Sequence, residues 1–383
     1  MRILRTIESF YPVVSGPANQ AFKISQELEK RGIRSPILTS NYNAESSSKT
    51  QKICKVEVFR FPVRCRFMKY FVTPDMKKKL KDFDIIHAHN YRSYQTAISF
   101  KAAKSSEKPF VISVHGSLLT YAHYLKGLAK IPYIVYDKCG GKRIINDADA
   151  VIVNSKQEYQ DAAEYGVKKE KVHIIPAGIN IDEYSPLDKE ENTLKILFVG
   201  RLSRKRNLEP IIKAAALLKK KIIKTSKKRI QFLIVGGEAK SSDTSRSGYL
   251  NELKQFATNL EVMDIIKFVG EKKGEELKKY YRTSDIFIYT SLSENFGQTI
   301  LEAGAAGLPL ICTKVGIAPE IINNNTNGFL IIGKPDEITE RIIDLFDKKK
   351  RENFGKITRE IIREKFNWDK ILDKYVQIYH DIL

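Results

Sequence analysis

Short runs of apolar residues alternate with longer amphipathic segments along all 383 residues, and this alternation limits the fold more than any other feature. The runs are rich in Val, Ile and Leu and do not alternate between apolar and polar residues, which is typical of strands buried on both faces of a parallel sheet. Segment 18–30 instead has helical spacing and is followed by Gly32, a residue that commonly ends helices. The pattern predicts a doubly wound α/β fold. The expected strands are 1–7, 84–88, 110–114, 150–153, 172–175, 194–199, 230–235, 265–269, 285–290 and 308–313.

The alternation stops and restarts near the middle of the chain. Residues 176–193 combine two prolines and a glycine with many polar residues, a composition typical of a link between domains. We therefore expect an N-terminal Rossmann-like domain over 1–180 and a C-terminal one over 190–365. Segment 366–383 holds Trp368 and an apolar face, and we expect it to form a final helix that packs on the N-terminal domain.

The chain is strongly basic, with 66 Lys and Arg against 45 Asp and Glu, a formal net charge of +21. This balance favours anionic partners, which include nucleic acid, acidic lipid and phosphorylated substrates. We find no nucleic-acid-binding module and expect no nucleic-acid partner. Scattered cysteines and the lack of a long apolar stretch favour a cytoplasmic setting. Basic, aromatic segments 60–81 and 121–145 suggest contact with an anionic membrane at its inner face, with solvated helices over an ordinary core as the alternative.

Segment 291–307, SLSENFGQTILEAGAAG, carries the clearest chemical pattern, because it passes from a strand into a helix. Glu294 precedes the helix and Glu302 follows in its early turns, so both carboxylates can face a crevice beyond the carboxyl ends of the strands. Free amides at the helix start would suit a diphosphate, and the carboxylates would suit ribose and sugar hydroxyls. Two solvated acids at a helix start are the alternative. The candidate binding residues are Glu294, Asn295, Phe296, Gly297, Gln298, Thr299 and Glu302.

A second candidate lies in segment 196–207, ILFVGRLSRKRN. The expected strand ends at Gly200, and Arg201 follows with Lys205 and Arg206 close behind. A guanidinium group matches a pyrophosphate well because it can donate two parallel hydrogen bonds. Whether Lys205 or Arg206 holds the phosphate stays open.

Other motifs point away from metals and bound cofactors. The chain has neither a GxGxxG after its first strand nor a phosphate-binding GxxxxGK[ST]. The acidic triplets 82–84 and 147–149 precede expected strands and so lie away from the ligand edge. His87 and His89 share one strand face, but no third ligand accompanies them. We therefore expect no metal and no cofactor.

Taken in order, these segments resemble the GT-B glycosyltransferases of family 4, which act with retention of anomeric configuration. The resemblance covers nearly the whole chain. It rests on SFYPVVSGPANQ, DIIHAH, ISVHG, ADAVIVNS, IIPAGIN, FVGRLS, LIVGG, the ENFG and LEAGAAGLP pieces, VGIAPEII and NNNTNGFL. It implies two Rossmann-like domains that face each other across a cleft.

The resemblance also implies roles for single residues. Glu294 would contact the donor sugar, Glu302 would bind the ribose hydroxyls, and Arg201 and Arg206 would hold the diphosphate. Further roles are implied for Gly16, which would let the loop after the first strand approach the phosphates, and for His115, which would contact the donor sugar. This chain departs from the family where Ser15-Gly16-Pro17 replaces a glycine pair, where Arg206 replaces a lysine, and at Gly304 and Ile317.

The activity implied is transfer of a sugar from a UDP-, GDP- or ADP-sugar to an acceptor hydroxyl, without a metal, in glycan, polysaccharide or glycolipid synthesis. Two mechanisms stay open: attack by Glu294, and a same-face substitution through an oxocarbenium-like state. A sugar-nucleotide epimerase of the same architecture is the alternative function. The sequence indicates no oligomeric state.

Overall fold

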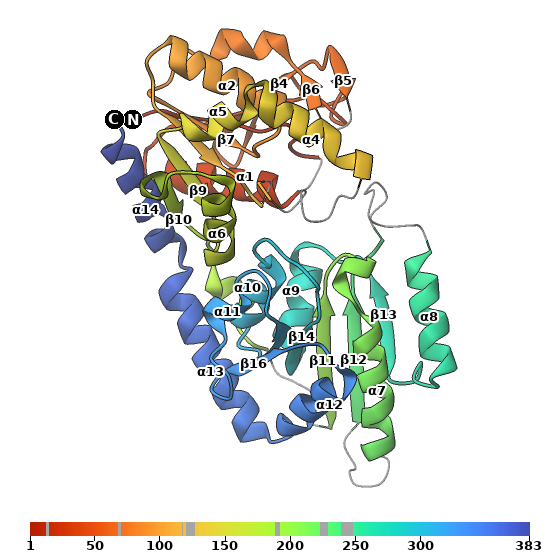
Figure 1. The fold of residues 1–383 in the computed structure, drawn as a ribbon. Helices are drawn as coiled ribbons and strands as arrows, with labels where there is room; N and C mark the ends of the chain where they lie inside the picture. Colours follow the sequence, from red (N-terminus) through yellow and green to blue (C-terminus); the bar gives the residue numbers. More distant parts are fainter. Residues whose placement is uncertain are drawn as a thin grey trace. The chain divides into compact units, whose positions relative to one another are not determined.

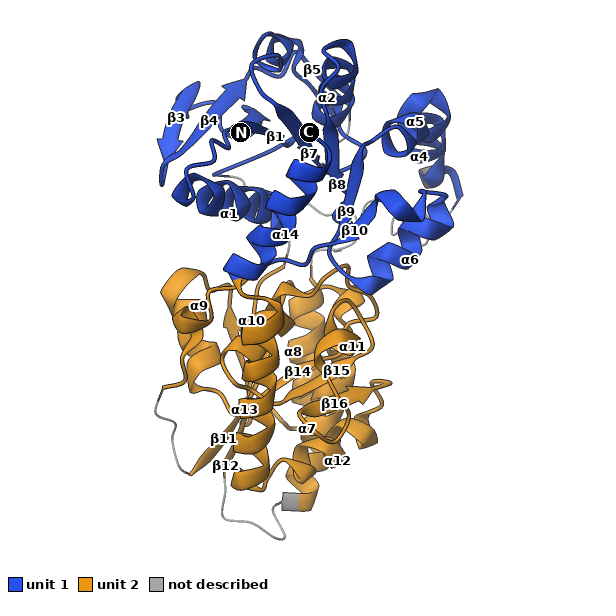
Figure 2. Cartoon of the chain, turned by 90° about the vertical axis from the view of Figure 1, so that its left-hand side faces the viewer, with its two compact units in different colours: residues 1–177, 368–383 blue, residues 178–367 orange. Residues whose placement is uncertain are grey.

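The computed structural model describes residues 1–12, 15–67, 70–116, 118–119, 127–187, 192–222, 229–238 and 248–383. They form two compact units, one of residues 1–177 and 368–383 and the other of residues 178–367 (Figure 2). Each unit has a largely parallel sheet with helices packed on it, which confirms the predicted α/β class.

The first unit is built on an eight-stranded sheet of order β10-β9-β8-β7-β1-β2-β4-β3. Every strand pair is parallel except β3 with β4, an edge pair that the sequence pattern did not predict. The strands are β1 (Ile3–Thr6), β2 (Ile37–Ser40), β3 (Thr50–Ile53), β4 (Val56–Phe61), β7 (Ile85–His89), β8 (Phe110–Ser113), β9 (Ala150–Val153) and β10 (Val172–Ile174), with a separate hairpin of β5 (Cys65–Phe67) and β6 (Tyr70–Val72). The helices are α1 (Gly16–Lys30), α2 (Tyr94–Ser105), α4 (Ile131–Tyr136), α5 (Lys142–Asn146), α6 (Lys156–Tyr165) and α14 (Trp368–Asp381).

The second unit is built on a six-stranded parallel sheet of order β13-β12-β11-β14-β15-β16. Its strands are β11 (Thr193–Val199), β12 (Arg229–Val235), β13 (Ile266–Gly270), β14 (Ile286–Tyr289), β15 (Leu310–Thr313) and β16 (Gly328–Ile331). Its helices are α7 (Glu209–Ile222), α8 (Tyr249–Asn259), α9 (Gly274–Thr283), α10 (Gln298–Ala305), α11 (Ala318–Ile321), α12 (Pro335–Asp344) and α13 (Lys348–Lys365). The chain enters this unit through a short 3₁₀ turn, η5 (Ile181–Tyr184), which packs into the hydrophobic core.

The C-terminal helix α14 belongs to the first unit, where it lies beside α1 (Figures 1 and 2). Its apolar face is buried in one cluster with residues of β1, α1 and β8. On its exposed side, Asp373 accepts a hydrogen bond of 2.6 Å from Arg31. Because Tyr375 and Tyr379 are fully buried, this helix places two hydroxyl groups in the core of the first unit.

Helix α10 is held against α13 by close contact between their backbones. Gly355 of α13 lies against the carbonyl of Gly307, and a Cβ atom at position 355 would be 2.0 Å from that oxygen. Arg359, also on α13, donates to the Ala305 carbonyl and, over 3.2 Å, to that of Ile181. Helix α13 therefore fixes the position of α10, the helix that carries Glu302.

We expect Gly355→Ala to destabilise the protein by about 1–3 kcal/mol, because the added methyl group has to displace the α10–α13 contact. Helix propensity alone predicts the opposite sign, about 1 kcal/mol of stabilisation. Urea unfolding measures the difference. The control is Asn353→Ala on the exposed side of the same helix, which we expect to change stability by less than about 0.5 kcal/mol. A Gly355→Ala protein as stable as the parent would show that the two helices separate easily.

Candidate functional site

In the second unit, the loops that follow β11 and β14 are tied together at the carboxyl edge of the sheet. The Lys205 carbonyl accepts a hydrogen bond of 2.9 Å from the Leu292 amide, and the Thr290 hydroxyl donates to the Asn207 carbonyl over 2.7 Å. The first loop also packs against the end of β12, since a Cβ atom on Gly236 would lie 1.9 Å from the Gly200 oxygen. The backbone thus brings the two sequence segments together.

Arg206, Tyr289 and Glu294 form a largely buried polar cluster at this edge, which we call the Arg206–Glu294 cluster. Arg206 forms an ion pair with Glu294 and donates to the hydroxyl groups of Tyr289 and, over 3.2 Å, Ser291. The Tyr289 hydroxyl donates to the same Glu294 oxygen over 2.6 Å. One carboxylate oxygen therefore receives both a guanidinium and a phenol donor.

The charges of the cluster stabilise one another. Burial alone would raise the pKa of Glu294, but Arg206 and Tyr289 outweigh burial and hold that pKa below its usual value. Burial lowers the pKa of Lys205, as do the neighbouring Arg206 and Arg201 charges, although Glu294 opposes them. The cluster therefore holds an ionised carboxylate and a guanidinium at neutral pH.

The N-terminus of α10 adjoins the cluster. Gly297 precedes the helix in the left-handed region (φ 93°) and offers no side-chain cap, so the amides of Gln298 and Thr299 can face an anion. The Asn295 amide already donates to Glu294 Oε1 over 3.1 Å. The Phe296 carbonyl accepts from the Ile317 amide over 2.8 Å.

Glu302 has a different set of neighbours from Glu294. The side chains of Tyr281, Gln298 and Tyr184 lie near its carboxyl group. Burial raises the pKa of Glu302 to about 7, because these neighbours and Lys278 only partly offset the loss of water. The two predicted carboxylates thus lie near the same end of α10 but have different neighbours.

The remaining predicted residues lie at strand or helix ends. Gly200 directly follows β11, and Arg201 after it is exposed, whereas Lys205 and Arg206 are partly buried. In the first unit, Gly16 begins α1 behind the capping residue Ser15, and a Cβ atom there would contact nothing. Among the described residues of this unit, no steric contact requires a glycine at position 16.

His115 follows β8 in the left-handed region, with φ of 49°, a conformation that is uncommon for residues other than glycine. Its Nε2 lies 2.9 Å from Nδ1 of His89, and its Nδ1 lies 3.4 Å from the Asn154 side-chain amide. Burial lowers the pKa of His115 to about 3, and the Arg5 charge acts in the same direction. The imidazole is therefore neutral at physiological pH.

Both acidic triplets serve the fold. Asp84 accepts from the Arg2 amide over 2.8 Å, and Asp149 accepts from the Phe110 amide over 2.8 Å. His87 and His89 are fully buried and contact Arg5. In the part of the chain that the structure describes, no group of three or more His, Cys, Asp or Glu side chains could hold a metal ion.

The comparisons with known proteins match this architecture. Residues 14–183 match the model of Glycosyltransferase Family 4, and residues 182–361 match that of Glycosyl transferases group 1. The chain therefore belongs to the GT-B glycosyltransferases of family 4 and is a glycosyltransferase.

Individual relatives span most of the chain. It is 29% identical to the alpha-monoglucosyldiacylglycerol synthase of Streptococcus pneumoniae, over 98% of this chain and 90% of the relative. It is 24% identical to a D-inositol 3-phosphate glycosyltransferase of Actinosynnema mirum, over 82% of this chain and 76% of the relative. The crystal structure of Anabaena HepE in complex with UDP-glucose shares the fold with a TM-score of 0.76 and 19% identity, each chain being covered in full.

The sequence analysis did not identify four buried polar residues: Tyr289, Tyr184, Tyr281 and Arg5. Tyr289 ends a buried strand, while Tyr184 and Tyr281 lie in core-forming segments, so all three looked like ordinary core residues. Arg5 sits inside the first apolar run. A charged residue in the middle of a buried parallel strand was the one available signal, because such a charge requires partners.

The raised pKa of Glu302 predicts a pH-dependent stability. Between its usual pKa of 4.5 and about 7, the folded state binds more protons than the unfolded state, so this group's contribution falls as pH rises through that window. We expect Glu302→Gln to melt at the parent's temperature at about pH 5 and to be more stable by on the order of 1 kcal/mol at about pH 8. Calorimetry at both pH values measures the difference. An equal difference at both would show that Glu302 ionises normally.

Proposed function

We propose that this glycosyltransferase moves a sugar from a nucleoside diphosphate sugar to an acceptor hydroxyl with retention of anomeric configuration. The Arg206–Glu294 cluster beside the uncapped N-terminus of α10 carries the proposal, because it joins an anion-binding site to a carboxylate. The complex of HepE with UDP-glucose supports a nucleotide sugar as the donor, and UDP is the first nucleotide to test.

Each group in the second unit then has a chemical task. Arg206 and the amides of Gln298 and Thr299 bind the diphosphate and stabilise the negative charge that grows as the bond to the sugar breaks. Arg201 and Lys205 add positive charge. Glu302 accepts hydrogen bonds from the ribose diol. Because these groups supply the neutralising charge themselves, the proposed reaction does not depend on a metal.

Glu294 would move from Arg206 to the sugar when the donor binds. Arg206 would then hold the phosphate, so neither charge is left unpaired. Placed beside the anomeric carbon, Glu294 stabilises the positive charge that develops there, either as a nucleophile or in a same-face substitution. His115 contacts a sugar hydroxyl, and Gly16 leaves room for the phosphates.

A nucleotide panel tests the donor site. We expect one of UDP, GDP and ADP at about 1 mM to raise the melting temperature of the parent by about 5 °C, and Glu302→Ala to lose most of that shift because the ribose loses its acceptor. Thermal melts of both proteins with all three nucleotides give the answer. An equal shift in the parent and the variant would show that Glu302 does not bind the nucleotide.

The reaction itself can be followed without knowing the acceptor, since water can replace the acceptor and hydrolyse the donor slowly. We expect the sugar first released from UDP-glucose, read by NMR before it equilibrates, to keep the donor's anomeric configuration. Arg206→Ala should lower this rate about 100-fold. Arg204→Ala is the control, because Arg204 lies in the same turn but pairs with the exposed Glu252. Inversion, or formation of an epimeric nucleotide sugar, would contradict the proposal.

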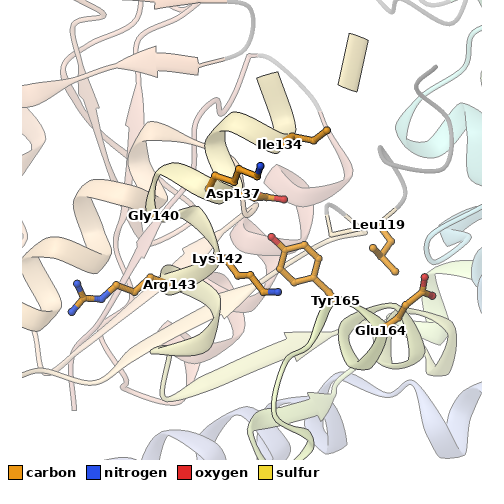
Figure 3. Close-up of a pocket in the computed structure, with 9 residues that line it drawn as sticks. Leu119, Ile134, Asp137, Gly140, Lys142, Arg143, Glu164 and Tyr165 are labelled. Carbon is orange, nitrogen blue, oxygen red and sulfur yellow. The ribbon is translucent and has the colours of Figure 1, made fainter. Parts of the chain in front are cut away.

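We also propose that the first unit rests on an anionic membrane surface through α4 and the 3₁₀ turn before it, η2 (Gly127–Lys130). Leu128, Ile131, Ile134 and Val135 are spaced three or four residues apart or adjacent, and all are exposed, Leu128 by 81%. The pocket that includes Ile134 is lined by three cationic side chains, Lys138, Lys142 and Arg143, and by two acidic ones, Asp137 and Glu164 (Figure 3). Apolar side chains bordered by cations complement anionic headgroups. Tyr121, Tyr124 and Leu125 lie outside the described residues.

This surface would bring the enzyme to a membrane-bound hydroxyl acceptor, as the name of the streptococcal relative, alpha-monoglucosyldiacylglycerol synthase, suggests. No helix among the described residues is long and apolar enough to cross a bilayer. In this proposal, attachment depends on the exposed face of α4 and on the lysine and arginine side chains beside it.

Vesicle binding tests the membrane surface. We expect Ile131→Asp with Val135→Asp to weaken binding to phosphatidylglycerol-containing vesicles at least about tenfold, because both apolar contacts are lost and negative charge is added. Sedimentation with these vesicles and with pure phosphatidylcholine vesicles measures it. Ile332→Asp, at a 71% exposed position of the second unit, is the control. Equal binding by the double variant and the parent would overturn this proposal.

A further inference from the structure

The turn that carries Arg206 is held in place by the loop after β14. This turn is a short 3₁₀ segment, η6 (Arg204–Arg206), and Asn207 ends it in the left-handed region with φ of 52°. That conformation is uncommon for residues other than glycine. The loop meets the turn with two donors, the Leu292 amide and the Thr290 hydroxyl, which bind carbonyls of residues 205–207. The shape of the turn therefore depends on groups outside it.

Thr290 supplies its donor from a fully buried side chain. Its hydroxyl donates to the Asn207 carbonyl over 2.7 Å and also lies 3.2 Å from the Arg206 carbonyl. These carbonyls are consecutive, so one hydroxyl fixes the main chain directly after the Arg206 side chain. A carbonyl that loses such a donor away from water is left unsatisfied, and the turn then gains by moving toward another donor.

The neighbours of Thr290 in the sequence hold the other end of Arg206. Nη1 of Arg206 donates to the hydroxyl of Tyr289, which precedes Thr290, and over 3.2 Å to that of Ser291, which follows it. Residues 289–291 thus contact both the main chain and the guanidinium group of Arg206. Thr290 contacts the main chain, so its hydroxyl can be removed without deleting a partner of the guanidinium group.

We infer that Thr290 is a positioning residue that directs the Arg206 side chain through the main chain of its turn. Its hydroxyl keeps the guanidinium group where a diphosphate can replace the Glu294 carboxylate. The inference deepens the proposed role of Arg206, and its consequence for UDP binding rests on that proposed function. Glu302 lies on α10 among other neighbours, so its proposed contact with the ribose does not pass through Thr290.

Three variants separate the hydroxyl from the rest of the side chain. Thr290→Val removes the hydroxyl and keeps the branched shape, whereas Thr290→Ser keeps the hydroxyl. Thr339→Val is the matched control, because Thr339 is also fully buried and its hydroxyl donates over 2.8 Å to the Pro335 carbonyl of its own helix. If Thr290→Val does not fold because its methyl group presses on the Asn207 carbonyl, Thr290→Ala removes the hydroxyl without that contact.

Amide hydrogen exchange of the full chain, followed by NMR, reports on the turn without any ligand. We expect the amides of Leu292 and Asn207 to exchange at least about tenfold faster in Thr290→Val than in the parent, because the turn opens more readily. Thr290→Ser and Thr339→Val should exchange like the parent at these two amides. Equal exchange in Thr290→Val and the parent would overturn the inference.

UDP affinity, measured by calorimetry, shows whether Thr290 acts through Arg206. We expect Thr290→Val to weaken UDP binding about tenfold, and Thr290→Ser and Thr339→Val by less than about twofold. In an Arg206→Ala background Thr290→Val should cost less than about twofold, since the group that it positions is absent. An equal loss in both backgrounds, or no loss in either, would overturn the inference. Faster exchange in Thr290→Val without any UDP binding by the parent would instead count against the proposed function.

Discussion

Parallel pairing of the central strands determines where each unit can carry chemistry. A parallel sheet buried on both faces presents the ends of its strands only at its edges, and all carboxyl ends meet at one of them. In the second unit this constraint joins the loops after β11 and β14, and with them Arg206 and Glu294. In the first unit it aligns the ends of β7 and β8, which carry His89 and His115. Residues far apart in the sequence thus become neighbours without any local motif.

The two units compensate the charge of a buried guanidinium group in different ways. Arg206 pairs with a carboxylate, so the charge is neutralised locally and a phosphate can replace that partner. Arg5 has only hydroxyls and imidazoles around it, so its charge is spread over neutral acceptors instead. The first arrangement can exchange one anion for another. The second has less freedom to exchange partners, because each acceptor is part of the folded core.

Much of this could be predicted from the sequence. Continuous apolar runs predicted the fold and most central strands because burial on both faces leaves a direct trace in composition. Glu294 and Arg206 were predicted because loops after strands carry polar residues that the core does not need. Strands β2, β3, β4 and β16 and the β5–β6 hairpin were missed, since each is short and most mix polar with apolar residues. Tyr289 and Tyr281 were missed because an aromatic residue in a strand or helix serves packing and hydrogen bonding equally well.

The distribution of charge agrees with the chemistry of a nucleotide sugar. Its diphosphate is anionic and gains charge as the glycosidic bond breaks, whereas its sugar hydroxyls stay neutral throughout. In the proposed reaction the second unit supplies cations and helix amides for the diphosphate. His115 contacts the sugar hydroxyls as an uncharged group. A histidine that could become a cation would attract the phosphates as well as the sugar, and it would lose its selectivity as the pH fell. Burial of His115, with the Arg5 charge acting in the same direction, lowers the pKa of its imidazole and excludes that cation.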